Sequence, residues 1–197
     1  MGAIFQSLGR TVTAGIVLLI VIILLVGSVT GTWIQFNHAW SLFFMRWLHV
    51  LSGVMWIGLL WYFNFVQIPS MPKIPDEQKP AIGKVIAPTA LFWFRWAAAA
   101  TVLTGLLLAW MSDYIAKALS LQPTHIAIGI GMWLALIMAY NVWFIIWPNQ
   151  KRALGIVPAE PDVKAKSARL AMLTSRANTL LSIPMLFCMV AQQNGGL

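Results

Sequence analysis

Hydrophobic positions in this chain fall into five long runs, which differ from the short alternating segments of a soluble domain. Charged residues and prolines concentrate in the segments between the runs. A run of about 18 or more apolar residues is long enough to cross a lipid bilayer as a helix. The sequence therefore predicts five transmembrane helices, over about 11–33, 40–66, 90–112, 124–147 and 170–191.

The runs favour helices over strands, because a helix satisfies its own backbone hydrogen bonds in lipid and the alternation of a membrane barrel is absent. We therefore expect an all-α integral membrane protein, with four helices in a bundle and one extra N-terminal helix. The expected parts are a transmembrane helix in 1–37 and a four-helix membrane domain in 38–197. The first run follows Arg10 as in a signal peptide, but no small-residue cleavage site follows it, so we interpret it as retained.

Prolines are dense between the second and third runs, over 68–89, and we expect them to preclude a long helix there. The segment 148–167 is expected to be a solvated connector. The segment 113–123 is expected to contain a short helix through Tyr114, Ile115, Ala118 and Leu119.

Positive charges fix the expected orientation. The chain has 13 Lys and Arg and a formal net charge of +8. With five crossings, nine of these residues share one face, and Lys117 alone lies on the other. Because cytoplasmic loops carry the excess of Lys and Arg, we expect a cytoplasmic N-terminus and a C-terminus on the outer side. Anionic lipid headgroups then account for the net charge, and no nucleic acid partner is expected.

Ionisable residues inside the apolar runs are candidates for function, because they are costly in lipid. The candidates are Arg46, His49, Arg95, His125 and Arg176, and no Asp or Glu lies within any run. Two interpretations of the arginines stay open. Arg95 and Arg176 can snorkel to the cytoplasmic edge while Asp113 reaches Arg46, or an anionic ligand such as the propionates of haem supplies the missing carboxylates.

His49 is the strongest single candidate for a ligand. Ser52 and Gly53 lie three and four residues later, on the same helix face, so a macrocycle can approach the backbone closely. Imidazole is a common axial ligand of haem iron. The alternative is a histidine that is hydrogen-bonded to a neighbouring helix.

A short internal echo suggests a second ligand. His49, Gly53 and Trp56 in the second run correspond to His125 and Gly129, followed by a tryptophan, in the fourth. The two histidines differ in expected depth by roughly 6 Å, which helix tilt can absorb, so ligation by both is one hypothesis.

Other interpretations of the second haem ligand, at the sixth coordination position of the iron, remain open. His125 can instead cap the start of the fourth helix. Met55, Met132 or an open sixth position would then complete the haem site.

Four blocks in order carry a family resemblance: 46–58 (RWLHVLSGVMWIG), 93–96 with 103–105, 141–150, and 178–187. Together they resemble the membrane domain of bacterial urate hydroxylases over about 38–191. The resemblance implies a haem-associated superfamily that also includes the membrane protoporphyrinogen oxidases and copper-resistance D proteins. It implies a location in the bacterial inner membrane, where the outer side expected for the C-terminus is the periplasm, and a haem ligand at His49.

The chain also departs from that family, whose members are larger and carry a C-terminal cytochrome c domain. Where the family has a His and a Glu on its third helix, this sequence has Phe92 and Ala97. The histidines that bracket the last helix are replaced by Ser175 or Arg176 and by Gln192 or Gln193. We therefore expect no catalytic residues and carry over no urate chemistry.

The expected function is an accessory subunit of a larger respiratory, photosynthetic or monooxygenase complex, in contact with lipids and other membrane subunits. Haem b is one candidate cofactor, and lipid, quinone and pigment are the others. Two other functions stay open. One is a stand-alone b-type haem electron carrier, and the other is a smaller oxidase or hydroxylase that still acts on a small molecule.

Overall fold

The computed structural model describes residues 2–196, and within that range the chain is helical and contains no β-strand. The all-α prediction is thereby confirmed. Five continuous helical runs are long and apolar enough to cross a membrane, judged by length and composition. They cover Leu8–Thr30, His38–Lys73, Lys79–Met111, Pro123–Ala153 and Pro161–Asn194.

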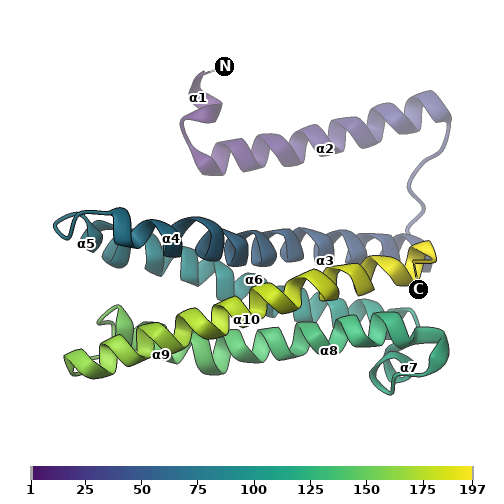
Figure 1. Ribbon diagram of the computed structural model, residues 1–197. Helices are drawn as coiled ribbons and strands as arrows, with labels where there is room; N and C mark the ends of the chain where they lie inside the picture. The colour runs from purple at the N-terminus through teal and green to yellow at the C-terminus, as the bar shows by residue number, and fades with distance from the viewer. Residues whose placement is uncertain (1, 197) are drawn as a thin grey trace. The chain divides into compact units, whose positions relative to one another are not determined.

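The helical elements are labelled in chain order, and the longer ones can be followed in Figure 1. The α-helices are α1 (Gly2–Phe5), α2 (Leu8–Thr30), α3 (His38–Trp61), α4 (Ile68–Ser70), α5 (Lys79–Ala81), α6 (Ala87–Met111), α7 (Ile115–Leu119), α8 (Ile126–Tyr140), α9 (Trp147–Ala153) and α10 (Pro161–Asn194). The π-helical turns are η1 (Tyr62–Gln67), η3 (Ile82–Ile86) and η5 (Asn141–Ile146), and the 3-10 turns are η2 (Met71–Lys73) and η4 (Pro123–His125).

The chain divides into two compact units, Met1–Ser41 and Leu42–Leu197, where the sequence placed a boundary after residue 37. In the first unit, α2 ends at Gly31, whose φ of 69° is the left-handed conformation that favours glycine. The chain then turns back so that Trp33 packs on Gly27, where a Cβ would lie 2.7 Å from the indole ring. A glycine is therefore needed at position 27 for this packing.

The second unit is built from four long helices that share one apolar core. Figure 1 shows α3, α6, α8 and α10 running alongside one another. Their most deeply buried side chains are Trp56 and Leu60 from α3, Phe94 from α6, Met138 from α8 and the η5 residue Val142. Each helix contributes apolar residues to the same cluster, so the core fixes the four helices relative to one another.

Buried amides and hydroxyls join the helices at the level of this core. Asn178 on α10 accepts a hydrogen bond from Asn141 Nδ2 (2.8 Å) and donates one from its own Nδ2 to the Met138 carbonyl (2.9 Å). Trp61 Nε1 donates to Ser182 Oγ at 3.0 Å. In an apolar surrounding such bonds satisfy groups that would otherwise be costly to bury.

The prediction that prolines break the helices between the second and third spans is wrong. The second run continues through Pro69 and Pro72 to Lys73, and the third begins at Lys79. Only 74–78 lies outside these two runs. The segment 148–167 is likewise shorter than expected, since α10 starts at Pro161 instead of near residue 170. The short helix near Tyr114 is confirmed as α7.

The π turns explain how three prolines are accommodated. The turns η1, η3 and η5 end two residues before Pro69, Pro88 and Pro148, respectively. In each case the residue before the proline donates its N–H to the carbonyl five residues earlier, as Ile68 does to Phe63. Proline has no N–H, and its ring clashes with the carbonyl four residues earlier in a regular helix. The wider π turn moves that carbonyl away and lets the helix continue.

Candidate functional site

A large cavity lies between α3, α6, α8 and α10, with Tyr114 at the start of α7 also in its wall. We call it the His49 cavity. Its volume of about 600 Å³ is in the range of sites for small molecules and cofactors. Most of the wall is aliphatic or thioether, so a ligand here would be largely apolar.

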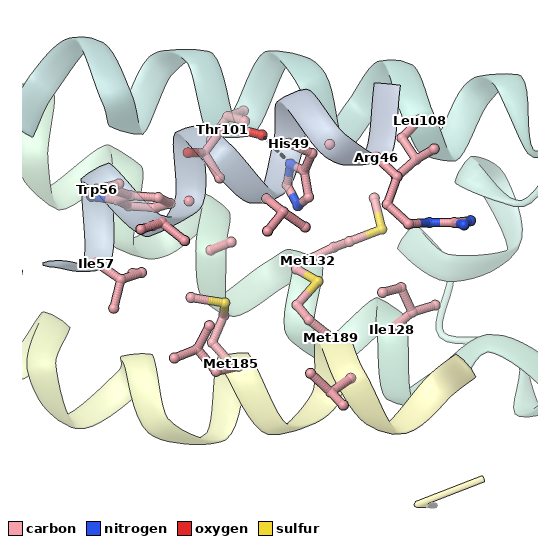
Figure 2. Close-up of a pocket in the computed structure, with 18 of the residues that line it drawn as sticks. Arg46, His49, Trp56, Ile57, Thr101, Leu108, Ile128, Met132, Met185 and Met189 are labelled. Carbon is pink, nitrogen blue, oxygen red and sulfur yellow. Dashed lines mark hydrogen bonds between the residues drawn. The ribbon is translucent and has the colours of Figure 1, made fainter. Parts of the chain in front are cut away.

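His49 presents one ring nitrogen to this cavity, and its hydrogen bonds indicate which nitrogen carries the hydrogen when the ring is neutral. Its Nδ1 lies 2.9 Å from the carbonyl oxygen of Thr101 on α6, and 3.3 Å from Thr104 Oγ1. A carbonyl oxygen can only accept, so Nδ1 carries the hydrogen and donates it. The neutral ring then has an unprotonated Nε2. Figure 2 shows that second nitrogen pointing away from α6, into the cavity.

Glycine on α6 makes this ring position available. A Cβ at Gly105 would lie 2.7 Å from His49 Cε1 and 3.1 Å from Nδ1, so any larger residue would displace the ring. On α3, Gly53 also lines the cavity, and a Cβ there would meet only Thr101 Cγ2, at 3.9 Å. Gly105 therefore lets the imidazole lie against α6, whereas Gly53 leaves space for a ligand beside the backbone of α3.

Arg46 lies one turn before His49 and lines one end of the same cavity, as Figure 2 shows. The expected ion pair with Asp113 is not seen among residues 2–196. Arg46 instead lies near Tyr114: burial raises the pKa of that phenol, and the Arg46 charge partly opposes the rise. The guanidinium is exposed and can pair with an acidic group of a ligand at this end.

Three methionines line the wall opposite His49, namely Met132 on α8 and Met185 and Met189 on α10 (Figure 2). Met132 was one of the predicted alternatives for a second ligand. The other, Met55, is 45% exposed and does not line the cavity. Sequence reasoning missed Met185 and Met189, although their spacing of four residues on one helix face was a signal for a shared wall.

Trp56 lines the part of the cavity far from Arg46 (Figure 2). The side chain is fully buried, and its Nε1 has no hydrogen-bond partner within the protein. The indole is part of both the cavity wall and the apolar core.

The structure does not bring His125 into the cavity. The residue lies in η4, immediately before α8, where its ring stacks on Tyr114 and its Nδ1 lies 2.8 Å from Thr124 Oγ1. Its partner in the echo, Gly129, also faces elsewhere. A Cβ at Gly129 would overlap the carbonyl oxygen of Ala118, so this glycine serves the close approach of α7 to α8.

The other two arginines of the spans lie outside the cavity. Arg95 places its guanidinium carbon 3.3 Å from the ring centroid of Trp147, in a cation–π contact. Its Nε and Nη1 are buried and have no hydrogen-bond partner within the protein. Arg176 is exposed. Of the three, Arg46 is thus the one placed to meet a ligand beside His49.

A second cavity of about 380 Å³ lies where the π turns occur, lined by residues of η1, η3, η5 and α10 among others. We call it the Gln67 cavity. Gln67 Oε1 is buried and has no hydrogen-bond partner within the protein. No signal in the sequence pattern predicted this cavity, because its walls depend on the irregular turns.

Comparison with known proteins gives one match. Residues 111–195 match the family model described as urate oxidase N-terminal. The match covers less than half of the chain, from the end of α6 through α10, and does not include α3 with Arg46 and His49. It relates the C-terminal part of the chain to a urate-oxidase family. No curated protein and no solved structure matches the chain.

Proposed function

We propose that this chain is a subunit of a redox complex in the bacterial inner membrane, where it holds a b-type haem in the His49 cavity. The observation that carries the proposal is the hydrogen bond from His49 Nδ1 to the Thr101 carbonyl. Histidines that bind metals typically donate their other N–H to a carbonyl or carboxylate, which fixes the tautomer and orients the ring. His49 has this arrangement, with Nε2 free to face a ligand.

The other residues of the cavity fit the same cofactor. Haem has a broad apolar face, which suits the aliphatic and thioether walls, and two carboxylates, which suit Arg46 at one end. Trp56 and the core behind it exclude water from the opposite end. When bound, haem b supplies a one-electron redox couple, and the surrounding residues set its potential.

A methionine, rather than His125, would hold the haem iron together with His49. Met132, Met185 and Met189 line the wall opposite His49, whereas His125 stacks on Tyr114 and does not line the cavity. Ligation by one histidine and one methionine raises the reduction potential relative to ligation by two histidines. We therefore propose a relatively high-potential electron carrier.

Electron transfer is favoured over hydroxylation by the lining of the cavity. Its only imidazole would be used by the iron, and none of its lining residues, all within the described range, is an aspartate or glutamate. Oxidation of a purine needs groups that move protons at the substrate. The relation of residues 111–195 to urate oxidase therefore supports a shared helical framework and not a shared reaction.

The proposed orientation follows from the charges in the loops. Eight Lys and Arg lie near the loop 74–78 or the connector between α9 and α10, and a ninth, Arg10, lies in the first turn of α2. Five crossings would put all nine on one side of the membrane, and that side is proposed to be cytoplasmic. His49 and Arg46 then lie in the periplasmic half of the membrane. Electrons would reach the haem from a periplasmic carrier or from a neighbouring membrane subunit.

The direct test is a pyridine haemochrome assay on the purified full chain. We expect about one haem b per chain for the wild type, and loss of at least nine-tenths of it in His49→Ala, because the axial ligand is removed. His38→Ala is the matched control, since His38 is exposed at the start of α3, and it should keep full occupancy.

A wild-type protein that is folded by circular dichroism but contains no haem, even after reconstitution, would contradict the cofactor. Full occupancy in His49→Ala would contradict the ligand. Co-migration of the chain with larger membrane proteins on a native gel tests the subunit part of the proposal separately. Migration as a lone small species would favour a stand-alone carrier.

A further inference from the structure

The Gln67 cavity is separate from the His49 cavity and presents its own set of polar atoms. Gln67 Oε1 is a buried acceptor that no group of the protein satisfies. An unpaired buried acceptor lowers stability, and such a group is expected to be paired in the functional state. A ligand with a hydroxyl or N–H group would supply the missing donor.

Ser175 on α10 adds a donor to the same cavity. Asn64 Nδ2 donates to the Leu60 carbonyl at 2.9 Å and to Ser175 Oγ at 2.8 Å. Because the Leu60 carbonyl can only accept, the orientation of the Asn64 amide is fixed, and Ser175 Oγ is an acceptor in this bond. Its own hydroxyl hydrogen remains free to be donated. The cavity therefore offers the Gln67 amide oxygen as an acceptor and the Ser175 hydroxyl as a donor, and the amide of Gln150 also lines it.

The charge of the lining restricts the chemistry of the ligand further. None of the residues that line the Gln67 cavity, all within the described part of the chain, carries a formal charge. Burial of a phosphate or ammonium head without a partner of opposite charge would be strongly unfavourable. The walls are otherwise apolar and aromatic, with Phe63 and Phe94 in edge-to-face contact at 5.6 Å. A neutral hydroxylated ring with an apolar tail fits both features.

The π turns create the space for this ligand. Phe63 and Gln67 belong to η1, Gly83 to η3 and Ile146 to η5. Each wide turn shifts the residues after it by about 100° relative to a regular helix, because one extra residue is inserted. At Gly83 a Cβ would meet only Leu154 Cδ2, at 3.9 Å, so the wall is open at this point.

We propose that the Gln67 cavity is a binding site for a membrane quinol, whose ring hydroxyl donates to Gln67 Oε1 and whose second oxygen accepts from Ser175. Binding at this site does not require haem in the other cavity. Only the further idea that the quinol delivers electrons to haem rests on the proposed function.

The test uses heptyl-hydroxyquinoline N-oxide, a fluorescent quinol analogue, titrated with the purified full chain after native quinones are removed. We expect saturable quenching at about one probe per chain. Decylubiquinol should displace the probe at least about fivefold more effectively than decylubiquinone, because only the quinol offers a donor to Gln67. Decanol, a neutral alcohol without a ring, should not displace it at the same concentrations.

Probe binding by two variants tests whether the ligand occupies the Gln67 cavity. Gln67→Leu removes the acceptor at nearly constant volume and should weaken probe binding about tenfold or more. The same change should raise the thermal stability of the ligand-free protein, because an unpaired buried acceptor is removed. Gly83→Leu should abolish binding by filling the cavity. Gln78→Leu, at an exposed position outside the cavity, is the matched control and should bind as the wild type does.

Unchanged probe binding in both Gln67→Leu and Gly83→Leu would overturn the site. Equal displacement by decanol would overturn the quinol in favour of a long-chain alcohol. The haem-free His49→Ala protein should still bind the probe. Failure of the haem assay with intact probe binding would therefore reject the proposed function alone, and the reverse result would reject the quinol site alone.

Discussion

The His49 cavity and the Gln67 cavity lie between the same long helices but offer different chemistry. The His49 cavity presents an unprotonated ring nitrogen, a guanidinium and three thioethers. The Gln67 cavity presents no formal charge, and its polar side chains are the amides of Gln67 and Gln150 and the hydroxyl of Ser175 among apolar walls. The first suits a metal-centred, acidic cofactor, and the second suits a neutral ligand that forms hydrogen bonds.

The difference arises from two ways of modifying a helix. Around His49 the helices are regular, and glycine allows a ring to lie directly on the backbone of α6 at Gly105. Around Gln67 the helices are interrupted by π turns before Pro69, Pro88 and Pro148. Glycine thus brings groups close enough to fix a side chain, whereas the π turns leave polar groups without partners.

The largest expected effect is a loss of haem affinity, and it compares one glycine from each cavity. Gly105→Ala would place a methyl 2.7 Å from His49 Cε1 and so displace the ring from the Thr101 carbonyl. We expect haem affinity to fall about tenfold to a hundredfold, as for other changes behind a metal ligand. Gly83→Ala has room for its methyl and should change haem affinity less than about twofold. Haem titration of the apo-proteins measures both, and equal affinities would remove the role assigned to Gly105.

A smaller effect concerns the packing of α7 on α8, next to Tyr114, which lines the His49 cavity. Gly129→Ala would force the Ala118 carbonyl away from α8, and we expect a loss of about 2 kcal/mol in the free energy of unfolding. Gly53→Ala meets its nearest atom at 3.9 Å and should stay within about 0.5 kcal/mol of the wild type. Unfolding in mixed detergent micelles provides the comparison. Similar costs at both positions would show that the two glycines of the echo have the same role.

The smallest expected effect tests the charge that only the His49 cavity has. Arg46→Met should weaken haem binding about twofold to fivefold, because the pair between an exposed guanidinium and a propionate is screened by water. The exposed Arg176 lines neither cavity, so Arg176→Met should leave the affinity unchanged. Added salt should reduce the difference between the wild type and Arg46→Met. A salt-independent difference would mean that Arg46 acts through packing.

The helical class and the five long runs could be predicted from the sequence, because hydrophobic length is a strong signal that does not depend on tertiary contacts. The residues at which the helices end between these runs could not be predicted. Prolines such as Pro69 and Pro72 ordinarily end a helix, and the rule fails here because π turns relieve the clash. A proline in the sequence does not reveal which of the two outcomes occurs.

The candidate site could be predicted in part. His49, Arg46, Gly53 and Trp56 line one cavity, as expected from their spacing on one helix. The echo at His125 suggested a second ligand, but equal spacing does not fix which way a helix face points. That depends on how α7 packs on α8, and no local pattern specifies this packing.

The hydrogen bond between His49 and Thr101 joins residues that are far apart in the chain. The unpaired Gln67 acceptor lies in an irregular turn. Neither feature leaves a signature in hydrophobic periodicity. They emerge only when the four helices are packed together.

The most direct test of the central claim, that His49 Nε2 is a haem ligand, is chemical rescue of His49→Gly. The variant should purify without haem, and addition of imidazole together with haem should restore a six-coordinate low-spin Soret spectrum at about one haem per chain. His38→Gly should need no imidazole. A spectrum of His49→Gly that forms fully without imidazole, or that imidazole does not restore in a folded protein, would contradict the account.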